Sequence, residues 1–130
     1  KKLIDFINKN KLEKFVKIKN FSSNPYNLIN KTDIFVLSSK YEGLPNVLLE
    51  AAYLKKYIIS SNCKTGPKEI IKNYKYGELY KLGNIDELSS KLKKLNKKKL
   101  KFNKKRLTNL KVFDYKKNLK KYLDEIKKLV

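Results

Sequence analysis

The sequence predicts an α/β fold in which helices flank a parallel sheet. Three observations lead to this prediction. Short apolar segments alternate with helical patterns, a polar loop follows most of these segments, and only helical patterns follow the last one. The chain has 130 residues, of which 41% are hydrophobic, so one core and one globular unit are expected.

The first elements are expected within the first 31 residues. Apolar side chains at helical spacing predict a short helix over residues 1–10. The apolar, β-branched residues at 15–18 predict a strand that leads into a loop. Residues 26–31 predict one helical turn, capped near Asn24 and with Pro25 as its first helical residue.

The middle of the chain carries the clearest alternation. Residues 33–37 are apolar on both faces and too short for a buried helix, which predicts a central parallel strand. Helical spacing returns over residues 46–54, and residues 57–61 predict the next strand. A short helix over 68–72 and a last short strand over 77–80 complete the predicted sheet.

The rest of the chain is expected to be helical and rich in lysine. Asp86 and Glu87 indicate a helix start because acidic side chains favour the first turn. Breaks are expected near Asn96 and between residues 109 and 114. Residues 1–95 are therefore predicted to form the α/β domain, and residues 96–130 are predicted to be helices packed on the same domain.

The loop between residues 37 and 46 carries the residues with the most suggestive chemistry. Glu42 and Glu50 lie eight residues apart, with Gly43 and Pro45 between them at a strand-to-helix turn. The first N–H groups of the following helix favour an anion such as a diphosphate, and Gly43 allows close approach to the backbone. A carboxylate such as that of Glu50 can accept hydrogen bonds from two adjacent sugar hydroxyls. The loop therefore suits a nucleotide-sugar.

Three segments together closely resemble one protein family. They are Asn24-Pro25-Tyr26, the run from Asp33 through the E-x7-E pair to Ala51, and Gly66-Pro67-Lys68-Glu69-Ile70. In this pattern and order they resemble the donor-binding half of the family 4 retaining glycosyltransferases of the GT-B fold. The resemblance covers residues 3–93, and residues 113–123 look like the closing helices of that family. It implies a Rossmann-like sheet that forms the C-terminal half of a GT-B fold.

The resemblance also implies a reaction and roles for individual residues. It implies transfer of a sugar from a nucleotide-diphosphate-sugar to a cell-envelope glycan or lipid-linked acceptor, with retention at the anomeric carbon. Glu42 matches the catalytic acid beside the reacting sugar, and Glu50 matches the acid that holds the ribose hydroxyls. Tyr26 and Asn24 match positions near the base. The backbone positions that match the phosphate and sugar cradle are Gly43, Leu44, Asn46 and Val47.

Some features of the family do not appear in the chain. The family has a basic pair near the start of this domain and an N-terminal domain that supplies the acceptor pocket, and neither precedes Lys1. We therefore expect a fragment that lacks its first strands and is inactive alone. The sequence contains no D-x-D motif, so neither a metal nor a cofactor is expected. Gly66 and Pro67 match a loop that closes the site, although a structural turn explains them equally well.

The charge of the chain leaves several interpretations open. The chain has 33 Lys plus Arg against 12 Asp plus Glu, a formal net charge of +21. Solvated lysine-rich faces, contact with an anionic membrane, and a basic nucleic-acid-binding module would all produce this excess. Nearly all of it is lysine, whereas nucleic-acid readers usually recruit arginine. Cys63 is the single cysteine, which fits a reducing, cytoplasmic location with at most peripheral membrane contact.

Overall fold

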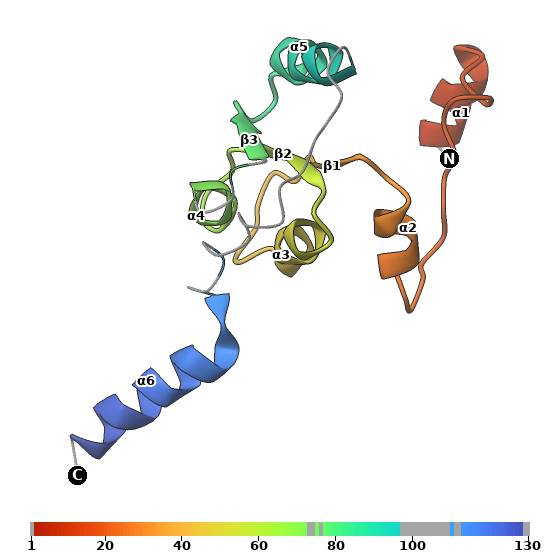
Figure 1. Cartoon of the computed structure of the whole chain (residues 1–130). Helices are drawn as coiled ribbons and strands as arrows, with labels where there is room; N and C mark the ends of the chain where they lie inside the picture. Colours follow the sequence, from red (N-terminus) through yellow and green to blue (C-terminus); the bar gives the residue numbers. More distant parts are fainter. Residues whose placement is uncertain (1, 73–74, 76, 97–109, 111–112, 129–130) are drawn as a thin grey trace.

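In the computed structural model, helices pack on both faces of a three-stranded parallel sheet (Figure 1). The structure describes residues 2–72, 75, 77–96, 110 and 113–128. The described elements, in chain order, are α1 (Lys2–Lys9), α2 (Tyr26–Asn30), β1 (Ile34–Leu37), α3 (Asn46–Tyr53), β2 (Tyr57–Ser61), α4 (Pro67–Lys72), β3 (Gly77–Tyr80), α5 (Ile85–Asn96) and α6 (Tyr115–Lys127).

The sheet has the order β1-β2-β3, and both strand pairs are parallel. Ile34 pairs with Tyr57, and Ile58 pairs with Gly77. Strand β2 is the middle strand, and its last four residues are buried. The predicted parallel sheet is confirmed, and β2 and β3 have the bounds that the sequence predicts.

The two faces of the sheet bury different side chains. Helices α3 and α4 cover one face, where Leu48, Ile58 and Ile70 are fully buried. Helix α5 covers the other face, where Leu95 packs with Ile59 and Tyr80 (Figure 1). Because side chains alternate along a strand, Ile58 and Ile59 point to opposite faces and tie both helical layers to β2.

Two predictions about strands are wrong in this structure. Residues 15–18 form no strand, and Phe15 is 82% exposed. Backbone groups at 15–18 pair with no neighbouring strand, so the β propensity of these residues is not realised. Strand β1 lies at the edge of the described sheet and not at its centre, and Val36 is 39% exposed. Its continuous apolar run indicates burial on both faces, which the described elements do not provide.

The predicted cap of α2 is also wrong. Pro25 occupies the N-cap position itself, and no side chain caps the helix. The carbonyl of Pro25 accepts hydrogen bonds from the N–H groups of Leu28 and Ile29. The backbone N–H of Asn24 is bonded to the hydroxyl of Ser22, so Asn24 belongs to the preceding loop.

The C-terminal part is described only in places. Helix α5 ends at Asn96, where a break is expected, while the predictions that fall on residues 97–109 lie outside the described residues. Leu110 and Phe113 pack against the core formed by α3 and α4. Helix α6 extends away from the sheet (Figure 1). Among the described helices, none has the length and apolar character needed to span a bilayer. The division at residue 95 remains a prediction.

Candidate functional site

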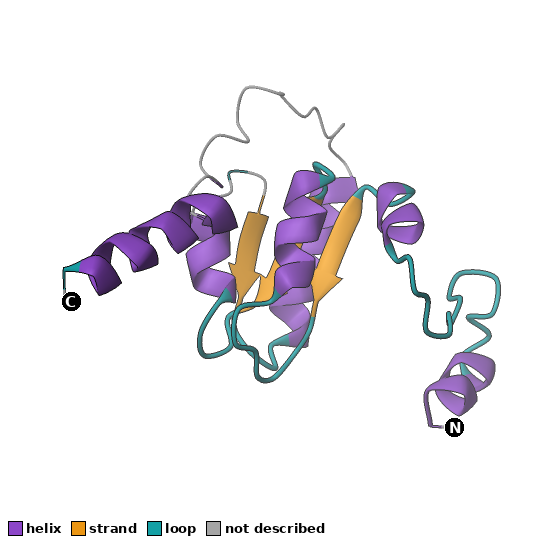
Figure 2. Cartoon of the chain, turned by 90° about the horizontal axis from the view of Figure 1, so that it is seen from below, coloured by secondary structure: helices purple, strands orange, loops and turns teal. Residues whose placement is uncertain are grey.

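The segment between β1 and α3 lies at the carboxyl edge of the sheet, where the loops after β1 and β2 gather (Figure 2). Glu42 is half-buried in this segment, and Gly43 and Leu44 are exposed. The carboxylate of Glu42 has no hydrogen bond or ion pair with the described residues. A Cβ atom built on Gly43 would meet nothing within 4 Å. The loop therefore presents a free acid beside an open stretch of backbone.

The start of α3 has no side-chain cap. Pro45 holds the N-cap position with φ −73° and ψ 94°, and its carbonyl accepts from the N–H of Leu48 at 2.9 Å. In the described structure no partner is bonded to the N–H groups at the four predicted cradle positions, Gly43, Leu44, Asn46 and Val47. Unpaired N–H groups at a helix N-terminus favour an anion because they carry partial positive charge.

The loop after β2 packs against this segment. The Thr65 hydroxyl donates a hydrogen bond to the Glu42 carbonyl at 2.6 Å, and the Ser61 hydroxyl donates to the Ser39 carbonyl at 2.6 Å. A Cβ atom on Gly66 would lie 1.9 Å from the Gly43 carbonyl oxygen, so only glycine fits there. These contacts fix the backbone that carries Glu42.

Thr65 and Gly66 both have left-handed backbone conformations, with φ of 59° and 78°. For threonine, a β-branched residue, this conformation is strained. The sequence left open whether Gly66-Pro67 is a turn or part of the site. The structure places Gly66 as a turn residue that supports the loop carrying Glu42.

Glu50 lies on α3 and lines a pocket of about 570 Å³. Its carboxylate is half-buried and has no partner among the described residues. The predicted Tyr26 lines the same pocket, but Asn24 and Glu42 do not. The remaining lining residues are Leu49, Tyr53, Leu110, Phe113 and Asp114. That both acids face one crevice remains a prediction.

Tyr53, Leu110, Phe113 and Asp114 line this pocket without having been predicted from the sequence. Tyr53 follows Glu50 by three residues, so helical spacing alone puts both on one face of α3. The pocket also brings Leu110, Phe113 and Asp114 beside α3, although they lie about sixty residues further along the chain. No local pattern in the sequence indicates such a contact.

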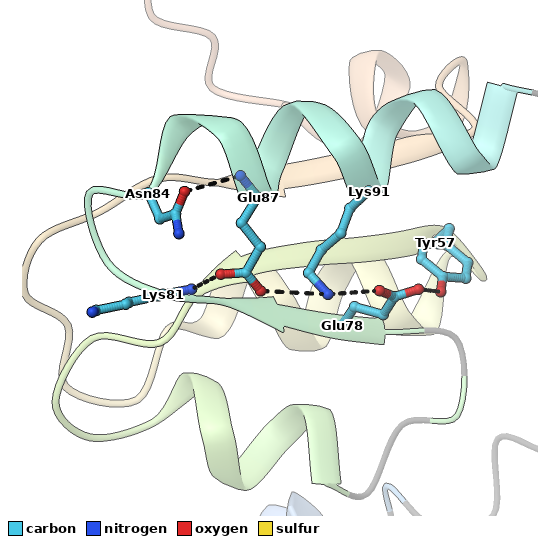
Figure 3. Close-up of polar contacts among 6 residues, drawn as sticks. All are labelled: Tyr57, Glu78, Lys81, Asn84, Glu87 and Lys91. Carbon is cyan, nitrogen blue, oxygen red and sulfur yellow. Dashed lines mark hydrogen bonds and ion pairs between the residues drawn. The ribbon is translucent and has the colours of Figure 1, made fainter.

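A separate set of polar contacts joins α5 to the sheet (Figure 3). Tyr57 donates a hydrogen bond to Glu78, and Lys91 donates to the other oxygen of Glu78 at 3.0 Å. The hydrogen bond from Tyr57 lowers the pKa of Glu78, with Lys91 acting in the same direction. The pKa of Tyr57 is raised mainly by its burial, and the hydrogen bond to Glu78 raises it further. These residues line neither the Glu50 pocket nor the loop of Glu42, so we interpret them as structural.

No three His, Cys, Asp or Glu side chains of the described residues cluster in a way that could hold a metal ion. The predicted absence of a metal in the reaction remains a prediction. The loop before α3 thus combines unpaired amides, a glycine with free space beside it and one acid without a partner, and the second unpartnered acid, Glu50, borders the pocket along α3. This combination can bind an anion that carries hydroxyl groups.

A parallel sheet with such groups at its carboxyl edge is typical of nucleotide-binding α/β proteins. A match to a known protein family is more specific than this general likeness. The family described as glycosyl transferases group 1 matches residues 1–108 of the chain. The chain belongs to this family, and the resemblance to the family 4 glycosyltransferases is confirmed. Its sheet agrees with the Rossmann-like C-terminal half of a GT-B fold.

Several curated relatives are glycosyltransferases. An uncharacterized glycosyltransferase of Methanocaldococcus jannaschii is 43% identical over 70 residues, which are 54% of this chain and 17% of that protein. The N-acetylgalactosamine-N,N'-diacetylbacillosaminyl-diphospho-undecaprenol 4-alpha-N-acetylgalactosaminyltransferase of Campylobacter jejuni is 29% identical over 70% of this chain and 25% of its own length.

The poly(ribitol-phosphate) alpha-N-acetylglucosaminyltransferase of Staphylococcus aureus is 28% identical over 72% of this chain and 19% of its own length. The aligned parts thus span about a fifth of the length of these curated relatives. No solved structure matches the chain significantly.

Proposed function

We propose that an enzyme containing this chain transfers a sugar from a nucleotide-diphosphate-sugar to a cell-envelope glycan or a lipid-linked sugar, with retention of the anomeric configuration. Family membership supports a glycosyl transfer. The names of two relatives support the acceptor class, because one includes a diphospho-undecaprenol-linked sugar and the other poly(ribitol-phosphate).

The observation that carries the proposal is the backbone at the start of α3. Four N–H groups there have no described partner, no side chain caps the helix, and Gly43 leaves space for a ligand. The diphosphate would bind these amides, which neutralise its charge as the bond to the sugar breaks. The leaving group is thereby stabilised without a metal.

Glu50 would accept hydrogen bonds from the ribose hydroxyls. Its carboxylate lies one turn into α3, has no described partner, and borders a pocket large enough for part of a nucleotide. Tyr26 shares this pocket and would contact the base. This arrangement orders the donor along α3, with its diphosphate at the N-terminus and its nucleoside beside Glu50.

Glu42 would lie beside the reacting carbon and stabilise the positive charge that develops on the sugar. The hydrogen bond from Thr65 to its carbonyl holds its backbone in place, while its carboxylate stays free. In the intact enzyme, Glu42→Ala should reduce kcat by at least about a hundredfold, because one electrostatic contact in the transition state is lost. Unchanged turnover would contradict this role.

The binding part of the proposal can be tested on this chain. Calorimetric titration with uridine and guanosine diphosphates should show saturable binding of at least one of them. Glu50→Gln should weaken that binding about tenfold, because a hydrogen bond to a charged acceptor is lost. Glu13→Gln is the matched control, since Glu13 is exposed and lies outside the site. Equal affinity in both variants would contradict the role of Glu50.

We also propose a cytoplasmic location with peripheral contact to an anionic membrane, where a lipid-linked acceptor would reside. On α6, Leu119, Leu123 and Ile126 share one face and are about half exposed, while lysines flank that face. The chain should co-sediment with phosphatidylglycerol vesicles and should not co-sediment with phosphatidylcholine vesicles. Equal binding to both, or binding to neither, would overturn the contact with an anionic membrane and leave the transferase proposal untouched.

A further inference from the structure

Two neighbouring residues of the loop after β2 contact two neighbouring carbonyl groups of the loop before α3. The Thr65 hydroxyl donates a hydrogen bond to the Glu42 carbonyl oxygen at 2.6 Å. A Cβ atom on Gly66 would lie 1.9 Å from the Gly43 carbonyl oxygen and 3.0 Å from the carbon behind it, so this carbonyl points at Gly66. Both carbonyl groups are therefore directed toward the loop after β2.

The direction of these carbonyl groups also sets the direction of two amide groups. A peptide unit is planar, and in the trans form its C=O and N–H point in opposite directions. No described peptide bond is cis. The N–H of Gly43 therefore faces away from Thr65, and the N–H of Leu44 faces away from Gly66. Both are among the predicted cradle positions, and neither has a partner in the described structure.

The peptide unit between Glu42 and Gly43 is the one whose direction is least fixed by its own residues. Such a unit reverses when ψ of the residue before it and φ of the residue after it change together, and glycine accepts nearly any φ at little cost. A reversed unit would present the Glu42 carbonyl oxygen in the direction that the Gly43 N–H now takes. That oxygen carries partial negative charge and would repel an anion.

Thr65 adopts an unfavourable backbone conformation while making its hydrogen bond. Its φ of 59° lies in the left-handed region, which β-branched residues avoid and glycine accepts. The hydroxyl also lies 2.8 Å from the Lys64 carbonyl, but it has one proton to donate and the Glu42 carbonyl is the nearer acceptor. Glycine at this position would relieve the strain but supply no hydroxyl. The contact of the hydroxyl with Glu42 therefore explains why threonine is present.

We propose that Thr65 is a positioning residue that keeps the peptide unit between Glu42 and Gly43 turned with its N–H toward the donor diphosphate. The proposal rests on the donor site proposed above, and Thr65 acts on that site through the backbone of the neighbouring loop. Loss of the hydroxyl lets the peptide unit reverse, which replaces an N–H with a carbonyl oxygen at the site. Thr65 thereby couples the loop after β2 to the anion affinity of the loop before α3.

The binding test is calorimetric titration of this chain with uridine and guanosine diphosphates. Thr65→Val removes the hydroxyl and keeps the shape of the side chain, so binding should weaken about tenfold. Thr65→Ser keeps a hydroxyl and should bind within about twofold of the unchanged chain. Thr32→Val is the matched control, because the Thr32 hydroxyl donates to the Ile29 carbonyl at 2.8 Å in another part of the chain. It should leave the affinity unchanged.

A third variant, Thr65→Gly, separates positioning from a merely structural role. Relief of the left-handed strain offsets the lost hydrogen bond, so the thermal midpoint should change by less than about 4 °C. Nucleotide binding should nevertheless weaken about as much as in Thr65→Val. Lys55→Gly is the control for strain, because Lys55 has a φ of 58° just beyond α3, and it should leave binding unchanged. If circular dichroism shows that Thr65→Val is unfolded, Thr65→Gly and Thr65→Ser decide the proposal.

A measurement without ligand keeps this proposal distinguishable from the donor site. Nitrogen-15 relaxation dispersion of this chain should show exchange at the Gly43 amide in Thr65→Val and none in Thr65→Ser or Thr32→Val. Absence of that exchange, or equal nucleotide affinity of Thr65→Val and Thr32→Val, would overturn the role of Thr65 and leave the donor site standing. If no nucleoside diphosphate binds the unchanged chain, the donor site fails, and the relaxation measurement alone decides whether Thr65 holds this peptide unit.

Discussion

The loops after β1 and β2 lie at the same edge of the sheet but differ in how tightly they are packed. A Cβ atom on Gly66, in the second loop, would meet backbone at 1.9 Å, whereas one on Gly43, in the first, would meet nothing within 4 Å. Gly66 has φ +78° and needs to be glycine for the fold. Gly43 has neither a positive φ nor a close neighbour. A ligand that approaches the backbone therefore explains better why glycine occupies this position.

The largest expected effect separates these two glycines by stability. Gly66→Ala should lower the free energy of unfolding by at least about 2 kcal/mol, because it adds both a clash and an unfavourable φ. Gly43→Ala should change it by less than about 1 kcal/mol. Urea denaturation followed by circular dichroism measures both. Similar losses in the two variants would contradict the comparison.

A smaller effect is expected on the affinity for a nucleoside diphosphate, which should depend on Gly43. Gly43→Ala should weaken nucleoside diphosphate binding about fivefold to tenfold, because its methyl group would keep the diphosphate from the amides of the loop. The stability measured above shows that this variant is folded. If the affinity of Gly43→Ala equalled that of the unchanged chain, close approach to this backbone would be ruled out.

The smallest expected effect concerns acid stability and lies away from the site. The pKa of Glu78 is lowered in the folded chain, so its contribution to stability is present above its unfolded pKa and is lost as pH falls through the folded value. Thermal midpoints measured from about pH 6 down to pH 3 should fall less steeply in Glu78→Gln. Glu125→Gln is the exposed control. Identical pH profiles for Glu78→Gln and the unchanged chain would contradict this contribution.

The sequence was sufficient where the pattern was local. Apolar runs with turn residues on both sides predicted β2 and β3 at their observed bounds. The prediction over residues 15–18 failed, because a strand forms only beside a partner, and β propensity does not reveal whether one is present. The same limit explains why β1 was predicted at the centre of the sheet and lies at its edge.

For the candidate site, the sequence predicted the loop and both acids, and this prediction remains to be tested, whereas the contacts around them could not be predicted. The E-x7-E spacing and the residues on both sides of it were enough to indicate the family. The hydrogen bond from Thr65 to the Glu42 carbonyl and the packing of Gly66 on Gly43 join residues more than twenty positions apart. Tyr53 could have been found from its spacing to Glu50, whereas Phe113 could not.

The amide groups at the start of α3 can be observed directly by nitrogen-15 NMR of this chain during titration with a nucleoside diphosphate. The account predicts that the amide signals of Gly43, Leu44, Asn46 and Val47 shift together and saturably, and that Glu50→Gln requires more ligand for the same shift. Shifts confined to the lysine-rich helices α5 and α6, with these four signals unchanged, would contradict the proposed donor site.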